Sequence, residues 1–419
     1  MSFRNVSCIF LLIAILPMSA QAMTPEAVLK SAWSDDRVKL HQEAQSITSD
    51  AKSYNLIDRA EFRFSHQHLF QDDVNNGLTL YPIKYGLRFY PKGLTEYQTT
   101  VQFQNAMESN EKTAQSAALS QLLAQRYGLL ARVALLREKH TLIKDLSKVT
   151  QKANQMLSYR AQKDSRELKS YLKSKSDLNK LELKISGVER EYKNLQSELN
   201  DLKLGTIETF DLGDLASMDD LRVQLEKAVE EKVPITLSAK MAELELAKSR
   251  AGIAYARAKD EKVFDHFEVT MSDNYHDKVY GLQLAFNLPF AAAPNLSRID
   301  QEVRELRDKA KLVKTLETSE RDFKNSLTEL KTLLDVYKSL RDVQARMNPE
   351  QMLKASRAIA PQDPQLAIEL QQGWFEGREQ LLDLEFKIRS LFVVYLHESS
   401  TIANAPEINY LSKSLKRIL

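Results

Sequence analysis

The sequence predicts a mainly α-helical fold with a small β part, built as a tandem repeat of helix, strand pair and long antiparallel coiled-coil hairpin. Three observations predict this fold. Long segments rich in Leu, Lys and Glu place apolar residues seven positions apart, which is the pattern of paired helices. Two pairs of short segments alternate apolar and polar residues, as β-strands do. The triplet Tyr-Gly-Leu begins at Tyr85 and again at Tyr280, and the same order of elements surrounds both copies.

Residues 1–22 are expected to form a secretory signal peptide. Arg4 precedes an apolar run that is too short to span a membrane, and Ala20-Gln21-Ala22 fits a cleavage site. Cys8 is the only cysteine among 419 residues and lacks the sequence context of lipoprotein processing, so the mature chain is expected to carry no lipid anchor, disulfide or thiolate site. No later run of about 18 apolar residues occurs, so a mature chain that enters a membrane is expected to do so as β-strands.

The first repeat is expected at residues 23–205. Thr24 is a favourable N-cap before Pro25, and the helix that begins there continues to about Tyr54. Strands follow at about 59–68 and 79–90, with a polar loop containing Asn-Asn-Gly between them. A helical hairpin covers about 97–204, its tip lies at about 158–167, and about 60 residues per helix would make it about 90 Å long. The heptad positions of its two helices are Leu122, Leu129, Leu136 and Ile143, and then Leu178, Leu181, Ile185, Val188, Tyr192, Leu195, Leu199 and Leu202.

The second repeat is expected at residues 233–398, after a linker or equatorial segment at 206–232. Its helix begins at Pro234, and its strands lie at about 264–272 and 278–290. Its hairpin covers about 295–398 with a tip at about 360–365, and a C-terminal tail follows at 399–419. The heptad positions of this hairpin include Leu316, Phe323, Leu330 and Tyr337 on the first helix and Leu381, Leu384, Ile388 and Leu391 on the last.

The four strands are long enough to cross the hydrocarbon core of a bilayer when tilted. Alternation gives each strand an apolar and a polar face, which is typical of a water-filled transmembrane barrel. The lipid-facing candidates are Phe62, Phe64, Tyr85, Leu87, Phe89, Leu282, Leu284 and Phe286. The lumen-facing candidates are Glu61, Arg63, Lys84, Arg88, Gln283 and Asn287.

Four strands cannot close a barrel, and open sheet edges do not occur in lipid. If the strands enter a membrane, several chains must share one barrel. The alternative is a small soluble antiparallel sheet that caps a coiled-coil protein, and amphipathic strands alone do not exclude it.

Three segments carry a resemblance to a known family. The strand "YGLQLAFNLPF" is similar to the family strand that enters a hairpin helix, "LELKISGVEREYKNLQSELNDLKLG" to its hairpin-exit helix, and "VPITLSAKMAELELAKSRAGIAYARAK" to the helix that precedes its second strand pair. On these segments the chain resembles the outer-membrane efflux protein family, the TolC-like channels. The resemblance covers essentially the whole mature chain and is one of pattern and order.

The resemblance implies a homotrimer in which three chains share a twelve-stranded transmembrane β-barrel and an α-helical tunnel. It implies a location in the outer membrane of a Gram-negative bacterium, in contact with lipid, with the tunnel in the periplasm. The implied function is the passive exit conduit of a tripartite efflux or type I secretion system. The implied partners are a periplasmic adaptor (a membrane fusion protein) and an inner-membrane transporter, and no cofactor is implied.

The hairpin tips depart from the family pattern, in which a glycine precedes an aspartate by six residues. The carboxylates nearest the expected places are Asp164 and Glu167 at the first tip and Asp363 and Glu369 at the second. We treat these four as candidates for the periplasmic aperture. The simpler interpretation is helix capping, because Asp164 and Glu167 have capping-box spacing and Asp363 precedes a first-turn proline.

Other function classes receive little support. The chain has 59 Lys and Arg against 57 Asp and Glu, so no basic field for nucleic acid exists. No phosphate-binding loop, zinc-protease motif or nucleophile elbow occurs, so no enzyme is expected. His66, His68 and His266 lack an evident third or fourth ligand partner, so no metal site is expected. The remaining alternative is a non-channel periplasmic coiled-coil structural or adaptor protein, although two hairpins and only 11 glycines disfavour an adaptor.

Overall fold

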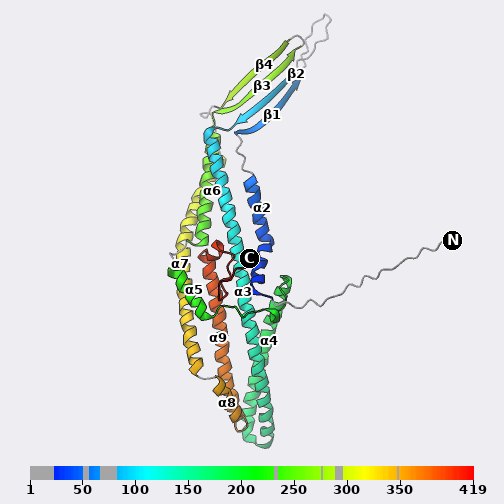
Figure 1. Cartoon of the computed structure of the whole chain (residues 1–419), viewed down its shortest axis with the longest axis vertical. Helices are drawn as coiled ribbons and strands as arrows, with labels where there is room; N and C mark the ends of the chain where they lie inside the picture. Colours follow the sequence, from blue (N-terminus) through cyan, green and yellow to red (C-terminus); the bar gives the residue numbers. More distant parts are fainter. Residues whose placement is uncertain are drawn as a thin grey trace, which may run out of the picture.

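The computed structural model of the chain describes residues 23–50, 56–66, 83–230, 235–274, 277–287, 296–346 and 349–419. The molecule is long and narrow, with a β-sheet at one end and two helical tips at the other (Figure 1). The expected signal peptide and the loop with Asn-Asn-Gly lie outside the described residues.

The first repeat begins with α1 (Pro25–Lys30), the 3-10 turn η1 (Ser31–Ser34) and α2 (Asp36–Asp50). The Thr24 side chain accepts a hydrogen bond from the Ala27 N–H and so caps α1. The single helix that we expected up to Tyr54 is broken at Asp35, where the backbone is extended. Strands β1 (Ile57–His66) and β2 (Ile83–Pro91) follow.

The first hairpin consists of α3 (Leu94–Lys163), the 3-10 turn η2 (Ser165–Glu167) and α4 (Leu168–Asp201). Its 70 residues make α3 about 105 Å long, longer than the expected 90 Å. The helix continues to Lys163, so the tip is a shorter turn than the expected 158–167.

The segment between the repeats is more ordered than its irregular, acidic sequence suggests. It contains the 3-10 turn η3 (Ile207–Thr209) and a helix, α5 (Met218–Glu230). The side chain and N–H of Ser217 both bond to Asp220, which gives α5 a local N-terminal cap.

The second repeat follows the order of the first. Helix α6 (Leu237–Asp260) begins three residues after Pro234, because Thr236 is its N-cap. Strands β3 (Phe264–Asn274) and β4 (Asp277–Phe286) lead to α7 (Leu296–Arg346). The return passes through α8 (Pro349–Ile359) and α9 (Pro364–Glu398), and α10 (Thr401–Asn404) begins the C-terminal segment.

The sheet joins the two repeats. Its strand order is β1-β2-β3-β4, and every neighbouring pair is antiparallel. The central pair, β2 and β3, comes from different repeats, so the duplicated strand pairs form one sheet. Within the described part of the chain, β1 and β4 each have one edge without a partner strand.

Helix α3 is the central element of the helical layer, and it packs against α2, α4, α6 and α9. Most of the predicted heptad residues are buried or half-buried between neighbouring helices, whereas Leu316 is 42% exposed. On α4 the buried positions include Val188, Leu195 and Leu199, and in the second repeat they include Phe323, Leu330 and Ile388. No helix within the described ranges combines the length and the apolar content that crossing a bilayer requires.

The C-terminal segment packs back onto the middle of the molecule. The Tyr127 hydroxyl on α3 donates to the Ile408 carbonyl at 2.9 Å and accepts from the Tyr410 N–H at 3.1 Å. Leu411 and Ile418 are buried in the main core. The C-terminal tail at 399–419 therefore packs against the core through some of its residues.

Candidate functional site

One face of the sheet is apolar, and no element of the described residues covers it. Strand register places Phe62, Leu87, Val269 and Leu282 in one row across the four strands. The exposed fractions of Phe62 and Leu282 are 67% and 69%, which is unusual for large apolar side chains gathered on one surface. All eight lipid-facing candidates lie on this face, namely Phe62, Phe64, Tyr85, Leu87, Phe89, Leu282, Leu284 and Phe286.

The opposite face is polar and carries a network of charged side chains. Glu61, Arg88, Glu268 and Gln283 form one row across the strands. Arg88 Nε donates to Glu268 Oε2 at 2.8 Å, and the Tyr90 hydroxyl donates to Glu61 at 3.2 Å. Five of the lumen-facing candidates lie on this face: Glu61, Arg63, Lys84, Arg88 and Gln283. Asn287 follows the end of β4, and its N–H donates to the Val263 carbonyl at 2.6 Å.

The glycine of the repeated Tyr-Gly-Leu triplet lies on this polar face, where a side chain would not fit. Gly86 of β2 and Gly281 of β4 both oppose Thr270 of β3 in a single row. A Cβ on Gly281 would lie 2.6 Å from Thr270 Oγ1, and a Cβ on Gly86 would lie 2.8 Å from Glu268 Oε1. Both glycines therefore make room for the side chains of β3, and neither needs an unusual backbone conformation.

The two tip turns lie together at the end of the molecule opposite the sheet (Figure 1). At the first tip, Asp164 is the C-cap of α3, and its carbonyl accepts from the Glu167 N–H at 3.1 Å. Glu167, rather than Asp164, is the N-cap residue of α4. The 3-10 turn η2 lies between these two residues and reverses the chain.

At the second tip, Asp363 is the N-cap of α9, and its Oδ1 accepts from the Leu366 N–H at 3.0 Å. Pro364 occupies the first turn, as the sequence suggested. Glu369 accepts from Lys173 Nζ at 2.6 Å, and this hydrogen bond holds the pKa of the Glu369 carboxyl below its usual range. Asp363 and Glu369 therefore each have a specific partner within the chain.

Comparison with solved structures decides the fold. The CmeC outer membrane channel of Campylobacter jejuni matches with a TM-score of 0.66 and 12% identity, over 90% of this chain and 85% of that one. The outer membrane protein VceC of Vibrio cholerae matches with a TM-score of 0.65 and 13% identity, over 90% and 95% of the chains. The MtrE outer membrane channel of Neisseria gonorrhoeae, in its open state, matches with a TM-score of 0.63 and 12% identity, over 92% and 93%.

The chain has the fold of these outer-membrane channels. The predicted resemblance to the TolC-like channels is confirmed at the level of the fold, since each match covers about nine tenths of the chain. No protein-family model and no curated protein matched the sequence.

The channel fold contains a contact between its two tips that the sequence did not suggest. Arg160, near the end of α3, donates from Nη1 to the Gln362 carbonyl at 2.8 Å and from its other terminal nitrogen to the Pro361 carbonyl. Lys184 of α4 also pairs with Glu379 of α9 at 3.0 Å. The two hairpins of one chain are thus joined at their tips by Arg160 and about midway along α4 and α9 by Lys184.

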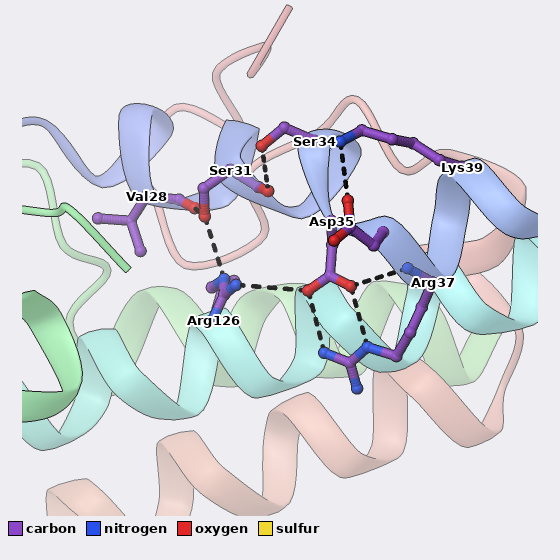
Figure 2. Close-up of polar contacts among 8 residues, drawn as sticks. Val28, Ser31, Ser34, Asp35, Arg37, Lys39 and Arg126 are labelled. Carbon is purple, nitrogen blue, oxygen red and sulfur yellow. Dashed lines mark hydrogen bonds and ion pairs between the residues drawn. The ribbon is translucent and has the colours of Figure 1, made fainter. Parts of the chain in front are cut away.

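A second cluster fixes the N-terminal helices of the channel fold on α3 (Figure 2). Arg37 binds the Asp35 carboxylate through Nε and a terminal nitrogen at 3.0 and 3.1 Å. Arg126, a buried residue of α3, lies 3.8 Å from the same carboxylate and donates to Ser31 Oγ at 3.0 Å. The hydrogen bond from Arg37 lowers the pKa of Asp35, whereas burial lowers the pKa of Arg126.

The histidines do not gather into a site. The backbone of His66 pairs with that of Ile83 at the end of β1, whereas His266 lies at the start of β3, where its Nδ1 contacts Asp265 at 2.7 Å. His68 lies outside the described residues. Across the described ranges, no three His, Cys, Asp or Glu side chains lie close enough together to hold a metal ion.

Proposed function

We propose that the chain is one protomer of a trimeric outer-membrane channel, in which three copies share a twelve-stranded β-barrel and a periplasmic α-helical tunnel. The channel would be the passive exit conduit of a tripartite efflux or type I secretion system. Energy would come from an inner-membrane transporter, so the chain itself needs no cofactor and no catalytic residue.

The two-faced sheet is the observation that carries this proposal. Its strands are 9 to 11 residues long, which suits a tilted strand that crosses a bilayer. Its exposed apolar face would contact lipid, and its polar face would line water. Because lipid does not tolerate open edges, β4 of one copy would pair with β1 of the next.

The helices offer matching surfaces for the same trimer. On α7, Ile299, Leu306 and Val313 are seven apart and have exposed fractions of 48%, 67% and 51%. On α2, Leu40 and Ile47 are also seven apart and exposed. Each of these heptad rows needs a partner helix to bury it. We therefore place α7 of one copy against α2 of its neighbour.

The tips would dock the periplasmic adaptor and, through it, the transporter. The resemblance to TolC-like channels supports this role, and so does the position of both tips at the end farthest from the sheet (Figure 1). Asp164, Glu167, Asp363 and Glu369 remain candidates for the aperture under this proposal.

Fractionation of the cells that produce the protein tests the proposal. We expect the protein in the outer membrane, as a detergent-resistant oligomer whose electrophoretic mobility changes on heating. A soluble periplasmic monomer would contradict the proposal and would favour a non-channel coiled-coil protein. The substitution Leu306→Lys should weaken the oligomer, whereas Lys309→Gln, on the same helix, leaves the exposed heptad row intact and provides the control.

A further inference from the structure

The charges on the polar face of the sheet are unequally exposed. The Glu268 side chain is 8% exposed beneath Arg88, and the Glu61 side chain is 30% exposed. The side chains of Arg59 and Arg63, which flank Glu61 on the same strand, are 59% and 49% exposed. The guanidinium groups of Arg59 and Arg63 are therefore more accessible to water than the two carboxylates.

The positive charges also outnumber the negative ones. Among the described side chains in the rows of this face, the cations are Arg59, Arg63, Lys84 and Arg88, and the carboxylates are Glu61 and Glu268. Glu268 is neutralised by Arg88, and Glu61 is shared by Arg59 and Arg63, at 3.1 and 3.8 Å. Asp265 lies at the bulge that begins β3, where it contacts His266. The described side chains of this face therefore carry more positive than negative charge. Lys84 is exposed and lies two rows away from the ion pair between Arg88 and Glu268.

Among the described side chains, the opposite face has no such excess. There Asp273 and Lys278 oppose each other across β3 and β4, in the row that contains His66 and Ile83. The positive excess thus belongs to the face that would line water, and three copies would repeat it around one lumen.

We infer that the barrel wall of this channel favours anions, with Arg63 and Lys84 as the residues that set the preference. The inference rests on the proposed function, because it requires three copies of the polar face around a common lumen. A charged wall with low-dielectric strands behind it raises the concentration of counter-ions near its surface. The effect extends about 10 Å from the wall at 0.1 M salt and weakens as salt rises.

Reversal potentials of the purified full-length protein in planar bilayers, under a KCl gradient, test the inference. The unmodified channel should give the sign of an anion-preferring pore, most strongly at low salt. The double variant Arg63→Glu, Lys84→Glu turns two positive charges of the polar face into two negative ones, a change of four charge units per chain, so the sign should reverse. Substitutions on the lumen side of a barrel tune selectivity and are tolerated better than charges on the lipid side.

The variant Lys278→Glu is the matched control, since it reverses a charge on the other face of the same sheet and should leave the reversal potential unchanged. A conducting channel that prefers cations, or that keeps its preference in the double variant, would overturn the inference while leaving the proposed function intact. A protein that never conducts would overturn the proposed function, and the inference with it.

Discussion

Asp35 lies between η1 and α2. Its carboxylate accepts hydrogen bonds from Arg37 and forms an ion pair with Arg126 of α3. We predict that Asp35→Asn lowers the stability of the protein by about 1 kcal/mol, because it weakens hydrogen bonds to charged donors. Chemical unfolding of the detergent-solubilised protein measures the change. Asp36→Asn is the control, since exposed Asp36 pairs with exposed Lys39 on the same helix. Equal effects of the two substitutions would contradict the role given to Asp35.

The same residue predicts a pH dependence. Arg37 lowers the pKa of folded Asp35, so the folded state favours the carboxylate. Its contribution to stability is present above the pKa of an unfolded aspartate, about 4, and is lost as pH falls through the lower folded pKa. The stability difference between the protein and Asp35→Asn should therefore shrink as the pH falls below about 4.

Arg160 gives a prediction about the tips. In Arg160→Ala the Pro361 and Gln362 carbonyls lose their donor, so the amides of Gln362 and Asp363, which bond to Ile359, should exchange hydrogen faster. Hydrogen-exchange mass spectrometry of the second tip measures this. Lys163→Ala is the control, because Lys163 bonds to Tyr159 of its own helix at 2.6 Å. Unchanged exchange in Arg160→Ala would show that the contact does not hold the turn.

At the residue scale, local contacts could be predicted and distant ones could not. The caps at Thr24 and Asp363 follow from side chains that bond within three residues, so the sequence alone indicates them. Arg160 bonds to backbone carbonyls about two hundred positions away, and no side-chain pattern signals a backbone acceptor. Glu268 was likewise absent from the lumen candidates, because only the register shows that it lies beside Arg88.

The heptad rows of the hairpins are the elements whose packing the sequence predicts most directly. We predict that Leu195→Ala, at a fully buried position between α3 and α4, costs about 2–5 kcal/mol of stability. Leu183→Ala removes a side chain of the same size that is 75% exposed, and it should change stability by no more than about 0.5 kcal/mol. Chemical unfolding of both variants measures the difference. Similar losses would contradict the packing of α4 on α3.

Two adjacent residues of β4 test the assignment of the sheet faces. Leu282→Arg places a charge on the apolar face and should cost about 2–4 kcal/mol if that face contacts lipid near the bilayer centre. Gln283→Arg places the same charge on the polar face and should be tolerated. The amount of each variant that reaches the outer membrane as an oligomer is the measurement. Tolerance of both substitutions would favour a soluble sheet.

Periodicity explains which elements could be predicted. Period two located all four strands and period seven located the hairpins, because both patterns record which side of an element is buried. Helix α5 and the packing of residues 399–419 were not predicted. Their buried residues, such as Leu221, Leu411 and Ile418, fill the core beside α3 and α9 without a long repeat of their own. The break at Asp35 was also missed, although Asp35 accepts a hydrogen bond from the Arg37 N–H at 3.1 Å, as an N-cap residue does.

At the scale of the whole molecule, the chain is a single curved portion of a larger closed structure under the proposed function. The sheet has two edges without partner strands in the described residues, and α2 and α7 carry exposed heptad rows. A threefold arrangement of the chain would pair β4 of one copy with β1 of the next and would bury both heptad rows. The tandem repeat doubles the wall that each chain contributes, so fewer chains are needed to close the barrel.

Electrical conductance of the purified oligomer in planar lipid bilayers tests the central claim most directly. The account predicts discrete conductance steps from the oligomer and none from the Leu306→Lys variant if that variant remains monomeric. An outer-membrane oligomer that inserts into the bilayer and passes no current would contradict the claim that three copies of this chain enclose a continuous water-filled path.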